Sequence, residues 1–434
     1  MPWGSLNDWP KAIVHVDGDA FFAACEQAVH PEYRGRPVVT GKERGIVSAA
    51  SYEAKARGIS RGVALHDVPK LCPDTIIVPS DYETYSLFSK RMFAIMRRTT
   101  PLVEEYSIDE GFADITGLRG PTHSSYETIA QKMQDAICSE LGITVSIGLS
   151  ISKVLAKIGS KYKKPHGFTS IPADAPKPYL EKTPLDNVWG IGPQTAAYAA
   201  KLGIATALDF VTRDAVFITT HFAKPQLELW KELRGESVYP IVPEEKSTYT
   251  SISKTRTFTP PSHDRAFVFA QLSKNLENAC IKARRHGLVT RRITLFLKTQ
   301  EFQYATTEGT LSRHSAYPHE MMIAIRPLFD ACFRNNTPYR ATGVVLTDLI
   351  LDTTIQRSLF ELPIKLERLQ RIYAAVDTLA EQFGKHVVTL GSSLLAHTQH
   401  TTSRGDLPLR KTHRLKGETK RLHLNLPLLL GTVR

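Results

Sequence analysis

At residues 13–22 the chain reads Ile13-Val14-His15-Val16-Asp17-Gly18-Asp19-Ala20-Phe21-Phe22, in which strand-forming apolar residues end abruptly at two aspartates. A second stretch, Tyr106-Ser107-Ile108-Asp109-Glu110, again leads from apolar residues into carboxylates. Residues that face each other on neighbouring strands of a sheet approach closely. If these two strands are neighbours, Asp17, Asp109 and Glu110 meet at one edge of a sheet.

Such a carboxylate cluster predicts a metal site. Three carboxylates at close range cannot all stay ionised unless a cation neutralises them. Their hard oxygen atoms, with positions left over for phosphate oxygens, suit Mg²⁺. Two such ions about 3.5–4 Å apart would activate an attacking hydroxyl group and stabilise a leaving pyrophosphate. The motifs therefore predict a metal-dependent phosphoryl or nucleotidyl transferase. His15 alternates with apolar strand residues and is interpreted as a packed or solvated histidine, because all-oxygen sites suit this chemistry better.

The size and charge of the chain indicate how many domains it has and what kind of partner it binds. The chain has 434 residues, too many for one hydrophobic core, so we expect about two to four domains. Its formal net charge of +12 and its pI of about 9.3 indicate a polyanionic partner, either nucleic acid or an anionic membrane surface. No apolar run approaches the ~20 residues that span a bilayer. The sequence therefore predicts a nucleic-acid partner and no membrane association.

The cysteines and the N-terminal segment bear on the cellular compartment. The five cysteines lie far apart and include no C-x-x-C pair, which gives no support to a zinc site or a redox motif. We expect reduced thiols and a cytoplasmic protein. Residues 12–16 are apolar, but Asp17 and Asp19 interrupt the run, so it is not interpreted as a signal peptide.

The N-terminal part of the chain alternates strand and helix patterns. This alternation, with carboxylates at strand ends, predicts an α+β palm from residues 11–28 and 83–171, with a small insertion at 29–82. We expect strands at 12–16, 37–40, 45–48, 103–106, 111–115 and 144–149, and helices at 21–30, 52–57, 82–98, 126–141 and 153–161.

A second region, at residues 172–237, contains the loop Gly190-Ile191-Gly192 ahead of Pro193. Such a loop lets backbone amides approach a phosphate at a helix N-terminus, as in a helix-hairpin-helix. The alternative is a glycine helix cap without a ligand. Pro193 at a first helical position favours the DNA-contacting version. Residues 238–250 contain two prolines and a charged run, which is typical of an exposed linker.

A further α+β domain is predicted at residues 251–352. We expect strands at 251–258, 290–299, 302–311 and 342–351, and helices at 264–286 and 318–333. Residues 282–292 form the densest basic cluster before the C-terminal tail and lead into a strand. Such runs are most often solvated surface. With a net charge of +12, we interpret the cluster as a phosphate-contacting surface, with Arg284, Arg285, Arg291 and Arg292 as its candidate DNA-binding residues.

Taken together, these motifs resemble Y-family translesion DNA polymerases. The residues concerned are Val16 to Phe22, Tyr106 to Glu110 and Leu155-Ala156-Lys157-Ile158. The hairpin at 190–192 and the 251–351 domain extend the resemblance from about residue 11 to 390. The DinB branch (bacterial DNA polymerase IV) is the most similar, with the UmuC branch second. The resemblance implies an α+β multidomain fold with a palm, small fingers, a helical helix-hairpin-helix thumb and a separate α+β little finger.

The resemblance also assigns roles at the carboxylates. Asp17, Asp109 and Glu110 would be catalytic metal ligands for two Mg²⁺ ions per active site, with the Gly18 carbonyl as a backbone ligand. Phe22 falls on the family's aromatic steric gate, whose ring excludes a 2′-hydroxyl group. The alternative is that Phe21 and Phe22 both pack in the core. Adjacent residues at a helix start point in different directions, so one can be core and the other exposed.

The remaining nucleotide-binding residues are also implied by the resemblance. Phe21 and Tyr52 would contact the incoming nucleotide, and Lys164 would pair with its phosphates. Lys55 stands where many DinB proteins have arginine, and Ala49 where many have threonine, so the chain lacks a bidentate fork and a hydroxyl group there. Two further acidic residues match no family ligand, and Asp19 is interpreted as a helix cap and Asp114 as structural.

The sequence Gln356-Arg357-Ser358-Leu359-Phe360 resembles the peptide with which bacterial polymerases dock into the sliding clamp. Leu359 and Phe360 would be apolar anchors, and Gln356 would add hydrogen bonds; the alternative is a packed linker. A helix is expected at 364–383, within a helical tail at 353–396. The basic stretch 397–434 is interpreted either as a flexible DNA-contacting tail that ends in a partner-binding peptide or as a segment without a role beyond solubility.

The functional prediction is a low-fidelity, template-directed DNA polymerase that adds deoxynucleotides to a primer 3′-hydroxyl opposite damaged templates. Its fingers are small, so we expect loose checking of the nascent base pair. No second set of acidic residues indicates an exonuclease, so we expect no proofreading. The expected partners are primer–template DNA, deoxynucleoside triphosphates and a sliding clamp, bound by a monomer. The rival readings are a catalytically idle DNA-binding scaffold, a nucleotide cyclase and a template-independent nucleotidyl transferase. Intact carboxylates argue against the first, and the basic extra domains against the second.

Overall fold

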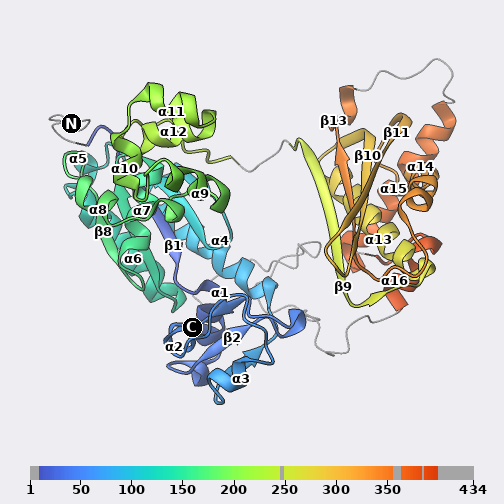
Figure 1. Cartoon of the computed structure of the whole chain (residues 1–434), viewed down its shortest axis with the longest axis horizontal. Helices are drawn as coiled ribbons and strands as arrows, with labels where there is room; N and C mark the ends of the chain where they lie inside the picture. Colours follow the sequence, from blue (N-terminus) through green and yellow to red (C-terminus); the bar gives the residue numbers. More distant parts are fainter. Residues whose placement is uncertain (1–8, 245–248, 355–362, 384–385, 399–434) are drawn as a thin grey trace. The chain divides into compact units, whose positions relative to one another are not determined.

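The computed structural model describes residues 9–244, 249–354, 363–383 and 386–398. The described residues form two compact units, which divide at residues 245–248 (Figure 1). This division falls within residues 238–250, the stretch predicted to be a linker. Both units combine helices with a β-sheet, so the predicted α+β multidomain class is confirmed.

A five-stranded sheet lies at the centre of the first unit. Its strand order is β5-β6-β1-β7-β8, in which β7 and β8 run parallel and the other neighbours are antiparallel. The central strand β1 carries the first acidic motif, and its neighbour β6 starts at the second, so both motifs lie in one sheet. The strands are β1 (Ile13–Gly18), β5 (Val103–Glu105), β6 (Glu110–Asp114), β7 (Val145–Ser150) and β8 (Phe168–Ser170).

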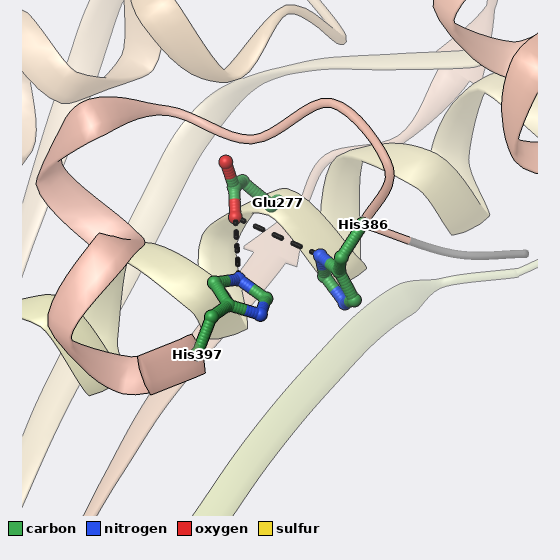
Figure 2. A group of neighbouring side chains, drawn as sticks. All are labelled: Glu277, His386 and His397. Carbon is green, nitrogen blue, oxygen red and sulfur yellow. Dashed lines mark ion pairs between the residues drawn. The ribbon is translucent and has the colours of Figure 1, made fainter. Parts of the chain in front are cut away.

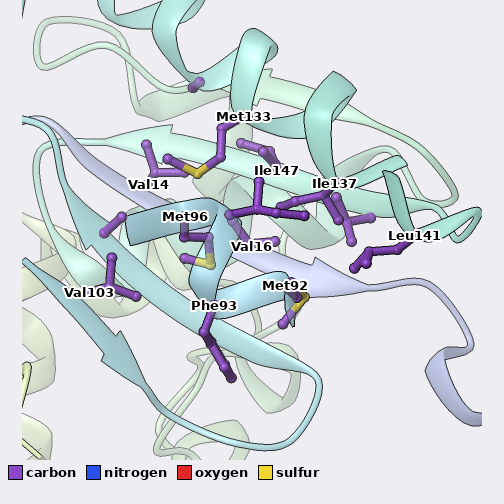
Figure 3. Close-up of a cluster of buried hydrophobic side chains, with 14 of the residues drawn as sticks. Val14, Val16, Met92, Phe93, Met96, Val103, Met133, Ile137, Leu141 and Ile147 are labelled. Atoms are coloured by element: carbon purple, nitrogen blue, oxygen red, sulfur yellow. The ribbon is translucent and has the colours of Figure 1, made fainter. Parts of the chain in front are cut away.

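One face of this sheet is apolar, because successive strand residues point to opposite sides. Val14 and Val16 point toward the helices α4 (Tyr82–Thr99) and α6 (Tyr126–Leu141), which close a dry cluster over them (Figure 3). Helix α4 contributes Met92, Phe93 and Met96 to this cluster, and α6 contributes Met133, Ile137 and Leu141. These contacts hold β1 in place beneath α4 and α6.

The opposite face carries the polar residues of β1. His15 and Asp17 alternate with the valines and therefore point to the side of the sheet where α7 (Lys153–Tyr162) packs. Helix α7 begins at an N-cap, Ser152, whose hydroxyl accepts a hydrogen bond from the Leu155 N–H group. His15 and Asp17 of the first acidic motif thus lie on the face of the sheet that α7 covers.

The insertion between the palm segments is a small three-stranded sheet in the order β3-β2-β4 with its own core. Its elements are β2 (Val38–Thr40), β3 (Ala49–Ala50), α2 (Tyr52–Ala56), α3 (Val68–Leu71) and β4 (Ile76–Val78), preceded by α1 (Phe21–Val29). The predicted strand at 45–48 is wrong. Left-handed glycines at 41 and 45 bracket a 3₁₀ turn, so the chain reaches strand geometry only at Ala49.

Five helices follow the palm in the first unit: α8 (Lys177–Glu181), α9 (Pro193–Lys201), α10 (Ala207–Thr212), α11 (Ala215–His221) and α12 (Lys224–Leu233). A short helix, α5 (Arg119–Thr122), precedes α6. The five helices share a core with Ile151, Leu155 and Ile158 of the palm, so the helical region is packed on the end of α7.

The second unit is a four-stranded sheet in the order β11-β10-β12-β9, with the short strand β13 paired to β10. Its elements are β9 (Ser251–Ser262), α13 (Arg265–Arg285), β10 (Leu288–Thr299), β11 (Tyr304–Ser315), α14 (Pro318–Cys332), β12 (Tyr339–Thr347) and β13 (Ile350–Leu351). Helices α13 and α14 bury one face of the sheet. The C-terminal part adds α15 (Pro363–Phe383) and α16 (Leu394–Thr398).

Candidate active site

Two of the three predicted carboxylates, Asp17 and Glu110, face each other at one end of the palm sheet, where their oxygens and a ring nitrogen of His15 lie within 4.8 Å of one another. The third, Asp109, lies in the turn just before Glu110. Asp17 on β1 stands directly opposite Glu110, the first residue of β6. The Gly18 N–H group donates a 2.8 Å hydrogen bond to the Asp109 carbonyl, which ties the turn before β6 to the end of β1. The juxtaposition follows from antiparallel pairing, since directly opposed residues share one face of the sheet.

The carboxylate of Glu110 contacts two side chains that favour its ionised form. Its Oε2 lies 2.9 Å from Lys157 Nζ and 3.2 Å from His15 Nε2. Burial alone would raise the pKa of Glu110. The contacts with His15 and Lys157 outweigh that effect and lower the pKa to about 2, from an ordinary 4.5. Glu110 is therefore an ionised carboxylate throughout the physiological pH range.

His15 is packed, as the sequence predicts, and it also contacts the cluster. Its side chain is fully buried, with Nδ1 2.7 Å from Ser160 Oγ. The Ser160 hydroxyl also donates a 3.0 Å hydrogen bond to the Lys157 carbonyl. Burial lowers the pKa of His15. The histidine thus connects Glu110 to α7 through Ser160.

Asp17 and Asp109 have different partners. Lys164 Nζ donates to Asp17 Oδ1 at 2.5 Å and lies 3.7 Å from Asp19 Oδ1. Asp109 instead accepts a 2.6 Å hydrogen bond from the neutral hydroxyl group of Ser107. Lys164, predicted from the resemblance, is therefore at the carboxylates, where it compensates the charge of Asp17.

The interpretation of Asp19 as a helix cap is wrong. Helix α1 begins after Ala20, with no side chain capping it. The Asp19 carboxylate is buried and accepts hydrogen bonds from the Ser146 hydroxyl, at 2.8 Å, and the His166 N–H group, at 2.7 Å. Asp19 therefore joins β1 to β7 and to the loop that carries Lys164.

The two phenylalanines after the first motif take different places. Phe21 is buried in the palm core, so its side chain belongs to that core rather than to a nucleotide site. Phe22 is only partly buried and stacks on Tyr85 with ring centroids 4.5 Å apart and an interplanar angle of 15°. Tyr85 is itself fixed by donating to Glu26 Oε1 at 2.5 Å. Phe22 is thus a partly exposed ring on a rigid support.

Tyr52 and Lys55 lie on α2 and extend the site toward the insertion. Lys55 Nζ lies 4.2 Å from the centre of the Tyr52 ring, a cation–π contact. Burial raises the pKa of Tyr52 to about 12, and the charges of Asp19 and Asp17 act in the same direction. Burial, followed by the nearby charge of Lys164, lowers the pKa of Lys55. Lys55, Lys164 and Tyr52 therefore lie around one region beside the carboxylates.

Sequence reasoning missed Lys157 and its aromatic neighbours. Lys157 Nζ lies 4.6 Å from the Tyr106 ring centre and 5.1 Å from that of Trp189. Trp189 Nε1 also donates a 2.9 Å hydrogen bond to the Tyr106 hydroxyl group. The signal was available, since Lys157 stands in a motif that carries the family resemblance. Its partner could not be read from the sequence, because Glu110 lies on a different element.

The predicted helix-hairpin-helix loop precedes α9. Gly190 has a φ of +93°, a left-handed conformation that favours glycine. Gly192 is the N-cap residue of α9 and is exposed, and Pro193 follows at the first helical position. Ile191 anchors the loop in the core beneath. The backbone N–H groups at the start of α9 therefore face outward.

The basic cluster of the second unit divides into one structural and three surface residues. The guanidinium group of Arg284 donates to both oxygens of Asp377 on α15, at 2.7 and 2.8 Å. This pairing favours a structural role for Arg284 over the predicted DNA contact, because the side chain is only 11% exposed and already paired. Arg285, Arg291 and Arg292 are more exposed, and Arg292 is 3.0 Å from Asp348.

Some predicted features lie outside the described residues. These are the candidate clamp-binding residues Gln356, Leu359 and Phe360, and all of the basic tail beyond Thr398. Within the described residues, none of the helices combines the length and the apolar character needed to cross a membrane.

Comparison with known proteins identifies the family. The model described as the impB/mucB/samB family matches residues 16–161, and the model of that family's C-terminal domain matches residues 249–359. A protein of Moorella thermoacetica named DNA polymerase IV is 34% identical over 389 residues, which are 88% of this chain and 96% of that protein. The chain belongs to this family. Another relative, DNA polymerase IV of Streptococcus pyogenes serotype M5 (strain Manfredo), is 30% identical over 79% of this chain and 95% of its own.

Solved structures agree with the family at the level of fold. The Y-family DNA polymerase chimera Dbh-Dpo4(243-245)-Dbh has a TM-score of 0.67 and 24% identity, covering 78% of this chain and 99% of its own. The insertion ternary complex of Dbh DNA polymerase has a TM-score of 0.54, with the same identity and coverage. The predicted membership of the Y family, on its DinB side, is confirmed. Members of this family depend on divalent metal ions in general.

Proposed function

We propose that this impB/mucB/samB family protein is a DNA-directed DNA polymerase that extends a primer 3′-hydroxyl by copying damaged as well as intact templates. The observation that carries the proposal is the pairing of Asp17 with Glu110 on adjacent strands of the palm, with Asp109 in the turn immediately before Glu110 and tied to Gly18 through its backbone carbonyl. It is supported by the relatives named DNA polymerase IV, which match nearly their whole length. A DNA-binding scaffold without chemistry would not need an ionised carboxylate held in a partly buried place.

The cluster fits divalent cations by its chemistry. Asp17, Asp109, Glu110 and the Gly18 carbonyl offer hard oxygen ligands, and Mg²⁺ is the cation that such ligands suit. When bound, two Mg²⁺ ions would lower the pKa of the primer hydroxyl group and offset the charge of the leaving pyrophosphate. The protein's own part is to keep these carboxylates ionised and close together. Lys157 and His15 do this for Glu110.

The nucleotide would bind between the palm and the insertion. Lys164 and Lys55 provide two positive charges near the carboxylates, and Tyr52 offers a hydroxyl group whose raised pKa keeps it a hydrogen-bond donor. These groups suit a triphosphate, which carries several negative charges. Phe22 would lie under the sugar, where its ring leaves no room for a 2′-hydroxyl group, and its stacking on Tyr85 prevents it from moving aside.

DNA would be held by both units. In the first unit, the exposed N–H groups at the start of α9, after Gly190 and Gly192, suit a backbone phosphate. In the second unit, Ile293, Leu295 and Leu297 of β10 are buried under the helices, so Arg292 and Lys298 project from the opposite face. Arg292 and Lys298 are the charges that this face would offer to DNA phosphates, and Arg292 would have to exchange its contacts with Glu308 and Asp348 for them. Solved relatives in fold include ternary complexes of Dbh DNA polymerase.

Low fidelity follows from the small size of the fingers. Residues 29–82 fold around one small core, with two- and three-residue strands. So little mass cannot enclose a nascent base pair on all sides, which leaves room for a distorted template base. The segment from Gln356 to Phe360 would add a sliding clamp as partner, through the apolar pair Leu359 and Phe360.

Primer extension tests the proposal directly. The purified chain is incubated with Mg²⁺, deoxynucleotides and a labelled primer on undamaged or abasic templates, beside Asp109→Ala and a surface control, Asp135→Ala. We expect template-directed extension by wild type and the control, and none by Asp109→Ala, which still binds DNA. Tight primer–template binding without extension by wild type would support the scaffold instead. Extension that ignores the template base would support a template-independent transferase.

A further inference from the structure

A second cluster of possible metal ligands belongs to the second unit, whereas the carboxylates of the palm belong to the first. Glu277 on α13 and two histidines of the C-terminal segment, His386 and His397, point their side chains toward one another (Figure 2). Glu277 Oε2 lies 3.8 Å from His386 Nδ1 and 3.9 Å from His397 Nε2. The three residues are far apart in the sequence, and the fold of the second unit brings them together.

The central carboxylate is buried and incompletely satisfied. Glu277 is only 6% exposed. Its Oε1 accepts the N–H group of Leu390, whereas its Oε2 accepts no hydrogen bond from the described residues. The buried Nε2 atom of His397 is also without a hydrogen-bond partner among the described residues. Buried polar atoms are nearly always satisfied, so such atoms facing each other indicate a missing ligand.

The hydrogen bond that His386 makes on its outer side suits a metal ligand. Asn278 donates its side-chain N–H to the Lys274 carbonyl, which turns its Oδ1 toward His386 Nε2 at 3.2 Å. His386 Nε2 therefore donates to Asn278, and Nδ1 is the ring nitrogen that faces Glu277. A histidine whose outer nitrogen donates to an amide or carboxylate oxygen is the usual arrangement around a bound metal.

The spacing of the three atoms suits zinc. All three lie within 4.8 Å of one another. An ion equidistant from them would be about 2.5 Å or less from each, so a contraction of ~0.4 Å reaches the 2.0–2.2 Å bonds that Zn²⁺ makes with nitrogen and oxygen. Two imidazoles and one carboxylate favour zinc over magnesium, which prefers oxygen ligands. Water would complete a tetrahedral site.

We propose that Glu277, His386 and His397 bind one Zn²⁺ ion that fastens residues 386–398 to helix α13. The segment is already aligned by polar contacts along the helix. Ser392 Oγ is 2.7 Å from Ser273 Oγ, and Lys274 Nζ donates a 3.0 Å hydrogen bond to the Ala396 carbonyl. The ion would add a further link between the segment and α13, and would hold the C-terminal segment against the rest of the second unit. The absence of paired cysteines does not bear on such a site, because it uses none.

Zinc binding to the full-length chain tests this proposal. Metal-stripped protein is titrated with Zn²⁺ in excess Mg²⁺, and bound zinc is counted by mass spectrometry after free metal is removed. We expect one zinc ion per chain, in wild type and in Asp109→Ala alike. Glu277→Gln and His397→Ala should weaken binding by more than about 100-fold, and Asn278→Ala by roughly 10- to 100-fold, since outer partners typically contribute that much. The exposed His263→Ala is the control and should bind as wild type does.

A second measurement needs no variant and guards against misfolding. Leu394 and Leu395 lie in the fastened segment and are partly exposed, so chymotrypsin can cut there when the segment opens. At a zinc concentration 100 times its Kd, cleavage should slow about 100-fold, because the metal binds only the closed state. Wild-type protein that retains no zinc, or cleavage that zinc leaves unchanged, would overturn the proposal. Loss of the zinc in Asp109→Ala would likewise overturn it, by assigning the ion to the palm.

Discussion

Replacing Lys157 by methionine tests whether the palm lysines hold the carboxylate cluster together. Lys157 and Glu110 have side chains only 8% and 18% exposed, with Nζ and Oε2 2.9 Å apart. The substitution keeps the length of the side chain and removes its charge. The carboxylate is then left partly buried beside His15 alone, and we expect the first unit to lose stability.

The magnitude follows from the pKa of Glu110. Its fall from 4.5 to about 2 corresponds to roughly 3.4 kcal/mol at 1.36 kcal/mol per unit. His15 supplies part of this effect, and water screens the exposed side of the pair, so we expect a loss of about 2 kcal/mol at pH 7. Because the folded pKa is depressed, this stabilisation is complete above pH 4.5. It disappears as the pH falls toward 2.

Urea unfolding, monitored by tryptophan fluorescence, measures this loss of stability in the first unit. All four tryptophans of the chain lie before residue 245, so their signal reports the first unit alone. Lys90→Met is a matched control, because Lys90 forms a more exposed pair with Glu105 and should cost less than about 1 kcal/mol. The double variant Glu110→Gln/Lys157→Met should be more stable than the sum of its single variants predicts, by about 1 kcal/mol or more. Strict additivity, or a loss below ~0.5 kcal/mol for Lys157→Met, would refute the reasoning.

Three other changes address separate features. Phe22→Ala should raise ribonucleotide use relative to deoxynucleotides by roughly 100-fold in kcat/KM, and unchanged sugar selection in single-nucleotide incorporation would eliminate the gate. Changing Leu359 and Phe360 to alanine should spare synthesis on a bare primer and remove stimulation by a sliding clamp; if the clamp still stimulates, the docking peptide lies elsewhere. Asp19→Ala should cost about 3 kcal/mol in urea unfolding, since it strands the buried Ser146 hydroxyl and the partly buried His166 N–H group, whereas a helix cap would cost only about 1 kcal/mol.

Local signals were enough to predict many of the elements. The helix predicted at 126–141 is observed as Tyr126–Leu141, because Ser125 caps its start and Gly142 takes the left-handed conformation at its end. The helix predicted at 82–98 extends by one residue, to Thr99, and Asp81 caps it. Both helices also carry an apolar face in their own sequence. Where the stabilising partners lie within a few residues, sequence patterns identify the element and its limits.

The errors occur where distant residues decide the structure. Asp19 has the side chain of a helix cap, yet its carboxylate accepts hydrogen bonds from Ser146 and His166, which follow it by 127 and 147 residues. The pairing of Lys157 with Glu110 depends in the same way on how α7 lies across the sheet. Glu277, His386 and His397 have no recognisable metal-binding spacing, since a helix and a returning segment supply them. Such partners become visible only in three dimensions.

The pairing of the carboxylates also shows which of them is best suited to a test of catalysis. The sequence argument required a cation because three carboxylates meet, but Lys164 already compensates Asp17, and Lys157 compensates Glu110. Removing Glu110 would leave Lys157 without its carboxylate partner, and removing Asp17 would leave Lys164 only its longer contact with Asp19, so either change would disturb the fold as well as the chemistry. Among the residues that the structure describes, the Asp109 side chain accepts a hydrogen bond from the neutral Ser107 hydroxyl alone, and its link to Gly18 uses the backbone. Loss of extension in Asp109→Ala can therefore be attributed to a missing ligand, provided that its urea midpoint stays near that of wild type.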